Sequence, residues 1–452
     1  MNIKSGCVNV TLFRIIALSL LLNSSAFSQN PFVGGQFTAD PSARVFDNRV
    51  YVYPSHDIPC TEGKGRIGWF CMEDYHVFSS DNLTEWTDHG VIVKQNEVPW
   101  VRKENYAMWA PDCIYKNGKY YFYFPTFPKD TTVIKGFTIG VAVADHPAGP
   151  YVPQPEPIAQ VRGIDPNVFI DKDGQAYLYW SARNIFGAKL KDNMLELATE
   201  PKILGDLPEK GLKEGPYMIE RNGIYYLTYP HVENKIERLE YAIGDNPLGP
   251  FKVAGVIMDE SPTGCWTNHH SMIQFKDQWY LFYHHNDYSP KFDKNRSIRV
   301  DSLFFHADGT IKKVLPTLRG VGITDATKPV QIDRYSRIID KGVSVAFLDT
   351  LNTFNGWKAI FDLPDSWLQY NRVDFGKKKF KTVSVKALSS GGTLQIRTKG
   401  VNGPVLAEII IPRSEKWTVT KASVKKTVSD IHDVVVVWKS NGRAEVDWIS
   451  FE

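Results

Sequence analysis

A short aromatic segment occurs five times along roughly the first two thirds of the chain, and this repeat restricts the fold more than any other feature. The copies are residues 49–54 (RVYVYP), 119–124 (KYYFYF), 175–180 (QAYLYW), 224–229 (IYYLTY) and 278–283 (QWYLFY). Each copy follows a short turn, such as Asn117-Gly118 or Asn222-Gly223. Because Asn-Gly favours the tight turn that joins two antiparallel strands, every repeat predicts a β-hairpin.

The spacing of these hairpins predicts a β-propeller. After the first unit the period is about 50 residues, which lies in the range for propeller blades. Segments between the hairpins, such as 139–144 (IGVAVA), supply further strands, and a helical period of 3.6 is nearly absent. We therefore expect an all-β protein with five blades of four strands over residues 29–325. A two-sheet sandwich is the competing arrangement, but it would not produce so long a repeat.

The repeat ends at a linker rich in Gly, Thr and Pro, residues 320–331 (GVGITDATKPVQ). Alternating strands without the aromatic hairpin follow at 382–386, 393–397, 432–438 and 444–449. This pattern predicts an antiparallel jelly-roll β-sandwich over residues 326–452.

Residues 1–28 have the pattern of a signal peptide. Lys4 and Arg14 accompany a short apolar run at 15–22, and a small-x-small cleavage site (AFS) follows at 26–28. The run is too short to span a bilayer and no later segment qualifies, so we expect a secreted or periplasmic protein without a membrane anchor. Losing the two basic residues lowers the formal net charge from +3 to +1, which argues against nucleic acid as a partner.

Four cysteines follow the predicted signal peptide: Cys60, Cys71, Cys113 and Cys265. An oxidising compartment permits a disulfide between Cys60 and Cys71, and free buried thiols are the alternative. The uneven spacing is unlike that of a zinc site.

Three of the five repeats carry an acid at the same position, directly before Pro or Gly-Pro where the hairpin begins. These acids are Asp40, Asp165 and Glu214. The innermost strand of each blade starts at the propeller axis, so equivalent positions should meet in one pocket. A single Asp-Pro pair usually marks only a turn, but three at one repeat position favour a shared site. Clustered carboxylates separate their pKa values, as acid–base hydrolysis of a glycoside requires.

Five motifs, in chain order, resemble those of family 43 glycoside hydrolases over about residues 30–320. They are TADPS (38–42), WAPD (109–112), GIDPN (163–167), KEGPY (213–217) and HHS (269–271). The resemblance implies a five-bladed β-propeller and inverting, single-displacement hydrolysis. It makes Asp40 the general base and Glu214 the general acid, with Asp165 raising the pKa of the acid and holding it in place. Base and acid should then be about 6.5–9.5 Å apart, which leaves room for the attacking water.

The resemblance also implies roles for two further residues. His269 would hold a metal ion, usually calcium, on the propeller axis with water completing the shell; the alternative is a core histidine bonded to backbone. Arg299 matches an arginine that contacts the sugar in the terminal subsite; the alternative is a plain strand arginine. The repeat register places Trp109 in the pocket wall, where a ring can stack on a sugar. Trp69 either lines the pocket or packs a loop. No organic cofactor is expected.

The C-terminal segment resembles family 6 carbohydrate-binding modules through GTLQIR (392–397), GVNGP (400–404) and EVDWISF (445–451). The acidic tripeptide usual at the start of such modules is degenerate here, which leaves both structural calcium and sugar binding by this domain open.

These observations predict a monomeric, inverting exo-glycosidase that removes α-L-arabinofuranosyl or β-D-xylosyl residues from plant cell-wall polysaccharides such as xylan, arabinan or arabinogalactan. Long rim loops between blades favour a closed pocket and therefore exo action. Within the same family, β-D-galactofuranosidase or β-galactosidase activity is an alternative. A retaining fructan-type propeller would use Asp40 as nucleophile about 5–5.5 Å from the acid, but the Trp-x-Asn-Asp-Pro context is missing. A non-catalytic carbohydrate-binding propeller is the third alternative.

Overall fold

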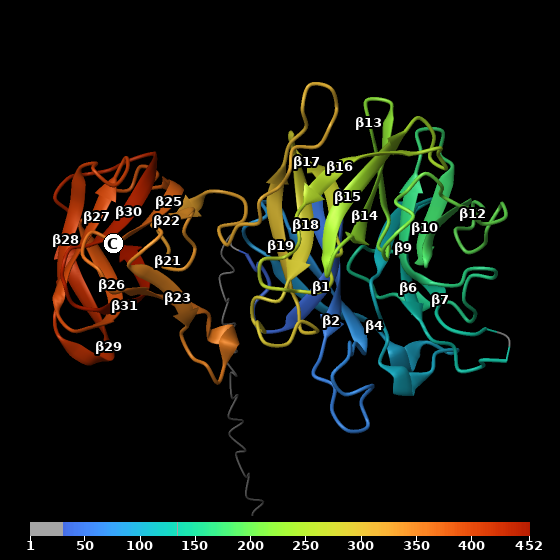
Figure 1. Cartoon of the computed structure of the whole chain (residues 1–452), viewed down its shortest axis with the longest axis horizontal. Helices are drawn as coiled ribbons and strands as arrows, with labels where there is room; N and C mark the ends of the chain where they lie inside the picture. The colour runs from blue at the N-terminus through green and yellow to red at the C-terminus, as the bar shows by residue number, and fades with distance from the viewer. Residues whose placement is uncertain (1–29, 133) are drawn as a thin grey trace, which may run out of the picture.

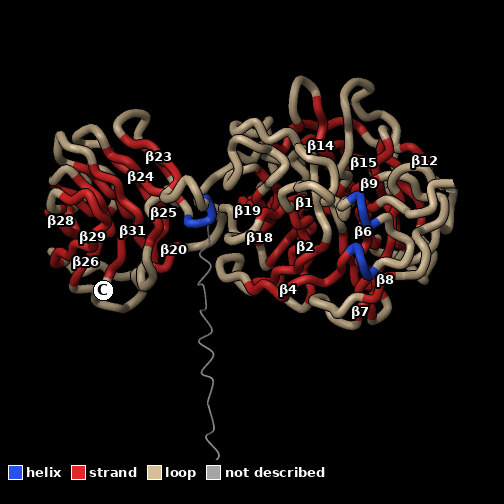
Figure 2. The backbone as a smooth tube through the Cα atoms, turned by 90° about the horizontal axis from the view of Figure 1, so that it is seen from below, coloured by secondary structure: helices blue, strands red, loops and turns tan. Residues whose placement is uncertain are grey.

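The computed structural model describes residues 30–132 and 134–452, so the predicted signal peptide lies outside the described residues. Two all-β domains lie side by side (Figure 1). Strands dominate both domains, and the only helical segments in the described residues are three single 3-10 turns at Gln95–Glu97, Lys103–Asn105 and Thr353–Asn355 (Figure 2). Among these residues no helix has the length and apolar character needed to cross a membrane.

The first domain is the expected five-bladed propeller, and each blade is one antiparallel sheet in chain order. The blades are β1 (Phe37–Phe46), β2 (Arg49–Asp57), β3 (Asp74–Ser80) and β4 (Thr87–Lys94); β5 (Asp112–Lys116), β6 (Lys119–Thr126), β7 (Thr138–Ala144) and β8 (Val152–Pro153); β9 (Ile164–Ile170), β10 (Ala176–Ala182), β11 (Asn184–Lys189) and β12 (Lys202–Ile203); β13 (Tyr217–Arg221), β14 (Ile224–Val232), β15 (Glu237–Gly244) and β16 (Lys252–Met258); and β17 (Ser271–Phe275), β18 (Gln278–His285) and β19 (Ser297–Leu303).

The repeated aromatic segments form the second strand of every blade, namely β2, β6, β10, β14 and β18. Three of the turns before them have the positive φ pair of a type I′ turn, as at Asn117 and Gly118 with φ of 52° and 79°. In the third and fifth hairpins only Gly174 and Lys276, respectively, have positive φ. The aromatic side chains fill the space between blades. On β6, Phe122 packs with Tyr53 of the first blade, whereas Tyr123 packs with Leu178 of the third. Adjacent aromatic residues of one strand thus join both neighbouring blades.

The fifth blade differs from the expectation of four strands, because its sheet contains three strands in the part of the chain that the structure describes. The N-terminal segment runs along the free edge of β19 instead. Asn30 Nδ2 donates to the Val300 carbonyl at 3.0 Å, and the Val300 N–H donates to Asn30 Oδ1 at 2.8 Å. The Thr38 N–H donates to the Arg296 carbonyl at 2.9 Å. The start of the described chain therefore closes the ring against its last blade.

The second domain is the expected β-sandwich, with two six-stranded sheets among its described residues. One sheet has the order β20-β25-β30-β27-β28 with β22 beside β25, and the other β23-β24-β31-β26-β29 with β21 beside β31. The strands are β20 (Thr324–Asp325), β21 (Val330–Gln331), β22 (Arg337–Ile338), β23 (Val343–Phe347), β24 (Trp357–Phe361), β25 (Trp367–Asp374), β26 (Thr382–Ser389), β27 (Gly392–Thr398), β28 (Val405–Ile411), β29 (Ser414–Ser423), β30 (Ile431–Trp438) and β31 (Ala444–Phe451).

Aromatic rings join the two domains. Tyr288 of the propeller stacks on Trp357 of the sandwich with ring centroids 5.1 Å apart, and Phe37 contacts Phe354 at 4.8 Å. Arg334 adds a hydrogen bond to the Asn30 carbonyl. The sandwich therefore packs directly against the closing edge of the propeller.

Candidate active site

A small pocket lies where the blades meet, and it contains the three acids that the repeat singles out. Asp40, Asp165 and Glu214 line it from the first, third and fourth blades, while Trp109 and His269 line it from the starts of the second and fifth. Its volume of about 110 Å³ is below the roughly 300–1,000 Å³ of pockets that enclose drug-sized ligands. The pocket thus has room for one small group rather than for a chain.

The backbone at two of the acids has the same unusual conformation. Asp40 and Asp165, each followed by Pro, have φ of 48° and 58°, and the strand pairing is shifted at both places. In the fourth blade Gly215, directly after Glu214, takes the positive φ of 52°. Non-glycine residues in this region cost about 1–3 kcal/mol and concentrate at functional sites. A bulge re-aims the side chain that it carries, so these irregularities direct the acids to the axis.

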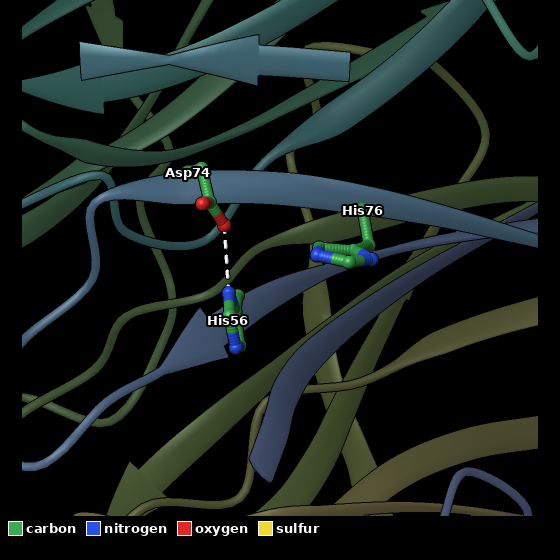
Figure 3. Close-up of side chains that lie close together, drawn as sticks. All are labelled: His56, Asp74 and His76. Atoms are coloured by element: carbon green, nitrogen blue, oxygen red, sulfur yellow. Dashed lines mark hydrogen bonds and ion pairs between the residues drawn. The ribbon is translucent and has the colours of Figure 1, made fainter. Parts of the chain in front are cut away.

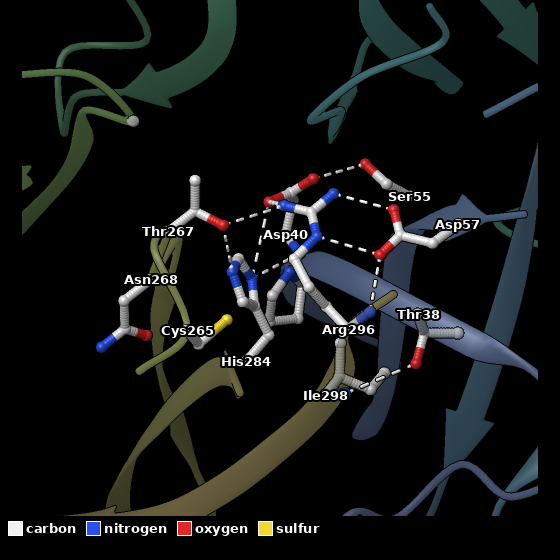
Figure 4. Close-up of polar contacts among 12 residues, drawn as sticks. Thr38, Asp40, Ser55, Asp57, Cys265, Thr267, Asn268, His284, Arg296 and Ile298 are labelled. Carbon is white, nitrogen blue, oxygen red and sulfur yellow. Dashed lines mark hydrogen bonds and ion pairs between the residues drawn. The ribbon is translucent and has the colours of Figure 1, made fainter. Parts of the chain in front are cut away.

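Asp40 is buried and receives hydrogen bonds on both carboxylate oxygens. Arg296 Nη1 donates to Oδ1 at 2.8 Å and Ser55 Oγ donates to Oδ2 at 2.7 Å (Figure 4). The Asp40 N–H donates to His284 Nδ1 at 3.0 Å. These donors fix the orientation of the carboxylate and stabilise its negative charge.

Arg296 is itself held by a second carboxylate on the far side of the guanidinium. Its Nε and Nη2 donate to the two oxygens of Asp57 at 2.9 and 2.8 Å (Figure 4). Burial lowers the pKa of Arg296, but the charges of Asp40 and Asp57 outweigh it and raise that pKa above its usual range. The arginine is therefore a permanent cation between the two acids.

A different environment surrounds the other acids. Burial raises the pKa of Asp165 well above its ordinary value, and the charges of Glu214 and Asp40 raise it further. Burial also raises the pKa of Glu214, and the neighbouring carboxyl of Glu237 lowers it. Glu237 is buried, and burial followed by the Glu214 charge raises its own pKa. Because these carboxyls are buried and close to other negative charges, they retain protons to higher pH than isolated acids.

His269 lies beside this group as a neutral imidazole. Burial, with the nearby charge of Arg296, lowers its pKa to about 3. The fourth blade approaches it closely, since a Cβ on Gly215 would come within 3.1 Å of His269 Nδ1.

Tryptophans and a phenylalanine form the pocket wall. Trp109 lines the pocket as expected, and Trp69 takes the first of its two expected positions and lines the pocket too, together with Phe70 and Trp266. Trp69 is 36% exposed and belongs to a loop tied by a disulfide between Cys60 and Cys71. The buried Trp109 Nε1 has no hydrogen-bond partner among the described residues, so this N–H is available to a bound hydroxyl. The other two cysteines of the described residues, Cys113 and Cys265, are buried thiols.

The structure does not bring Arg299 to this pocket. Arg299 is buried on β19, where Nε donates to Asp287 Oδ2 at 2.9 Å and Nη2 bonds the other oxygen. Arg296, three residues earlier, lines the pocket instead. The sequence signal was an arginine at the start of the third strand of the blade, and it did not distinguish the two. Glu237, Phe70 and Trp266 also had no sequence signal that set them apart from core residues.

A buried carboxylate cluster in a small aromatic pocket on a propeller axis has the groups that a carbohydrate-cleaving enzyme, a glycoside hydrolase, uses. The family model "Glycosyl hydrolases family 43" matches residues 28–311, and "Carbohydrate binding module (family 6)" matches residues 348–452. The chain belongs to glycosyl hydrolase family 43 and carries a family 6 module at its C-terminal end.

Similar proteins agree with this assignment. Xylosidase/arabinosidase 43A of Humicola insolens is 38% identical over 62% of this chain and 98% of its own length. The structure of CoXyl43, a β-xylosidase/α-arabinofuranosidase from a compost metagenome in complex with xylotriose, is 37% identical, covers 64% of this chain and 97% of its own, and has a TM-score of 0.57. A Bacillus subtilis arabinoxylan arabinofuranohydrolase, 24% identical, covers 94% of this chain and 97% of its own at a TM-score of 0.56, and so shares the two-domain fold.

Proposed function

We propose that this enzyme removes single α-L-arabinofuranosyl or β-D-xylosyl residues from xylan or a related plant polysaccharide, with inversion at the anomeric carbon. One observation carries the proposal: Asp40, Asp165 and Glu214 meet in a pocket of about 110 Å³. A pocket of that size favours a terminal sugar over the middle of a chain. Both sugars are pentoses that share the arrangement of ring substituents, and the Humicola insolens relative bears both activities in its name.

The environments of the two principal acids support different roles. Asp40, bonded by Arg296 and Ser55, serves as the general base and takes a proton from water as the water attacks the anomeric carbon. Glu214, whose pKa burial raises, serves as the general acid and gives its proton to the glycosidic oxygen as the carbon–oxygen bond breaks. Asp165 accepts a hydrogen bond from the Gly215 N–H at 3.0 Å, and this contact supports a role for Asp165 in orienting the neighbouring acid and tuning its pKa.

We also propose that His269 helps to bind a calcium ion whose other ligands are mostly water. The residues fit such an ion in two respects: the imidazole is neutral, and carboxylates line the same pocket. They do not form a cage of protein oxygens, because no group of three close His, Cys, Asp or Glu ligands among the described residues includes His269. When bound, the ion would supply positive charge beside the acids. No step of hydrolysis is assigned to it.

The cellular setting is proposed on two observations. The signal-like sequence of residues 1–28 and the Cys60–Cys71 disulfide both favour a secreted or periplasmic enzyme. We propose that it acts as a monomer, which light scattering of the purified protein tests directly.

Hydrolysis of a substrate panel tests the activity. Para-nitrophenyl α-L-arabinofuranoside, β-D-xyloside, β-D-galactofuranoside and β-D-galactoside are compared with arabinoxylan, arabinan and arabinogalactan. Release of arabinose or xylose in greatest yield is expected. Preference for a galactoside, or no release from any substrate, contradicts the proposal.

Proton NMR of the first-formed sugar then tests the mechanism. Inverted anomeric configuration is the expected result, and retention would assign Asp40 the role of a nucleophile.

A further inference from the structure

Two histidines and an aspartate gather on the first blade, on strands that also support the active site. His56 lies on β2, and Asp74 and His76 lie on β3 (Figure 3). One ligand atom from each side chain lies within 4.8 Å of the ligand atoms of the other two. His56 Nδ1 is 2.6 Å from Asp74 Oδ1, and the two imidazole centroids are 5.0 Å apart.

The register of the two strands explains why these residues share one face. β2 and β3 are antiparallel, with Val52 opposite Phe78 and Ser55 opposite Tyr75. Continuing this register places His56 opposite Asp74, with His76 two residues further along the same side of β3. The side chains are partly accessible, with exposed fractions of 19% for His56, 12% for Asp74 and 14% for His76. Solvent ions can therefore reach the cluster.

The orientation of His76 is fixed from behind by another carboxylate. His76 Nδ1 is 3.1 Å from Asp88 Oδ1 on β4, and the Gly90 N–H donates to the same oxygen at 2.7 Å. A histidine that ligates a metal usually has its second ring nitrogen bonded to a carboxylate, which fixes the tautomer and the ring orientation. Asp88 provides that support and leaves Nε2 of His76 free to bind.

We propose that His56, Asp74 and His76 bind a divalent transition-metal ion, with Zn²⁺ as the probe. Imidazole and carboxylate ligands suit zinc and its neighbours, whereas calcium prefers six to eight oxygens. The cation takes the place of the proton between His56 Nδ1 and Asp74 Oδ1, and water completes its shell. Zinc bonds of 2.0–2.1 Å separate tetrahedral ligands by about 3.3 Å. Ligand atoms that lie up to 4.8 Å apart therefore need to approach by at most about 1.5 Å, which side-chain rotation allows.

A metal ion at this site would affect the active site through β2, which carries residues of both. Between the pairs at Val52 and Ser55 the β2–β3 ladder is interrupted, where Pro54 has no N–H to donate. Beyond that interruption, Ser55 and Asp57 bond Asp40 and Arg296 of the active site. A metal bridge between His56 and β3 would therefore hold the end of β2 that positions the proposed catalytic base.

Isothermal titration of the whole, tag-free protein with Zn²⁺ tests the site without reference to hydrolysis. We expect one equivalent of zinc to bind, with the affinity reduced at least tenfold in His56→Asn and in His76→Asn. Asp88→Asn should weaken binding about 10–100-fold, as for other carboxylates behind a ligating histidine. His146→Asn, which removes an exposed histidine, is the matched control and should bind as the wild type does.

A second measurement keeps the test valid if a ligand variant folds poorly. Zinc should raise the unfolding temperature of the wild type and of His146→Asn by several degrees, and should raise that of Asp88→Asn by clearly less at the same concentration. Binding that persists in the His56→Asn/His76→Asn double variant, or that disappears in His269→Asn, would place the metal in the catalytic pocket and overturn the proposal. Absence of stoichiometric binding to the wild type would also overturn it.

Discussion

Arg296→Lys and Arg299→Lys are a matched pair, because both arginines are buried and bonded to a carboxylate, yet only the first lines the pocket. Arg296 makes three side-chain hydrogen bonds of 2.8–2.9 Å to Asp57 and Asp40. Bonds to charged groups contribute about 1.5–3 kcal/mol each, and one ammonium retains about one of the three. Losing two of these bonds should therefore destabilise the protein by about 3–5 kcal/mol, which is the range for breaking a buried ion pair.

Differential scanning calorimetry measures this loss of stability, with the unfolding transition of the sandwich domain as the reference. At about 2 °C per kcal/mol for a large domain, Arg296→Lys should lower the propeller transition by about 6–10 °C, while the transition of the sandwich stays unchanged. Arg299→Lys should destabilise the propeller by a similar amount, because Asp287 loses its paired guanidinium.

Activity at 25 °C, where both variants remain folded, separates the two arginines. Arg296→Lys releases one oxygen of Asp40, and misplacement of a catalytic group by an ångström costs on the order of 100-fold. We expect kcat/KM to fall by about that factor in Arg296→Lys and by less than a few-fold in Arg299→Lys. Equal activity losses in the two variants, or full activity with an unshifted transition in Arg296→Lys, would refute the assignment of the pocket arginine.

Three further predictions concern the acids and the proposed calcium. Glu214→Gln should lower kcat/KM for xylo-oligosaccharides by about 10²–10⁴-fold, and by less for aryl glycosides whose leaving group needs no proton; a uniform loss would contradict its role as the acid. Glu237→Leu removes the neighbouring carboxyl that lowers the pKa of Glu214, so that pKa rises and the alkaline limb of the pH–kcat/KM profile should move to higher pH. Glu237→Gln, which keeps a donor, should leave the limb nearly in place. Calcium titrated calorimetrically into the wild type should bind, and His269→Asn should abolish binding; equal heats from both would exclude a site at His269.

The propeller could be predicted from the sequence because its hairpins depend on interactions between residues close together in the chain. Turn pairs such as Asn117-Gly118 and alternating aromatic strands specify hairpins through contacts within a few residues, and all five hairpins form as predicted. Fivefold repetition also brought Asp40, Asp165 and Glu214 to one pocket, because equivalent positions of equivalent blades face the same axis.

By contrast, no sequence pattern indicated which residues of β19 face the pocket or how the N-terminal segment closes the last blade. A shift of one residue turns a side chain to the other face of a sheet, so the sequence did not tell Arg296 from Arg299 at the start of β19. Glu237, at the start of β15, comes close to Glu214 only in the folded chain, and residues 30–38 replace a fourth strand in the last blade.

The sequence by itself determined the hairpins, the number of blades and the meeting of three acids, because each follows from short-range patterns repeated at a fixed period. Only the tertiary structure decided which charges pair behind those acids. That choice depends on which residue of a strand faces which neighbour, and distant segments settle it when they pack together.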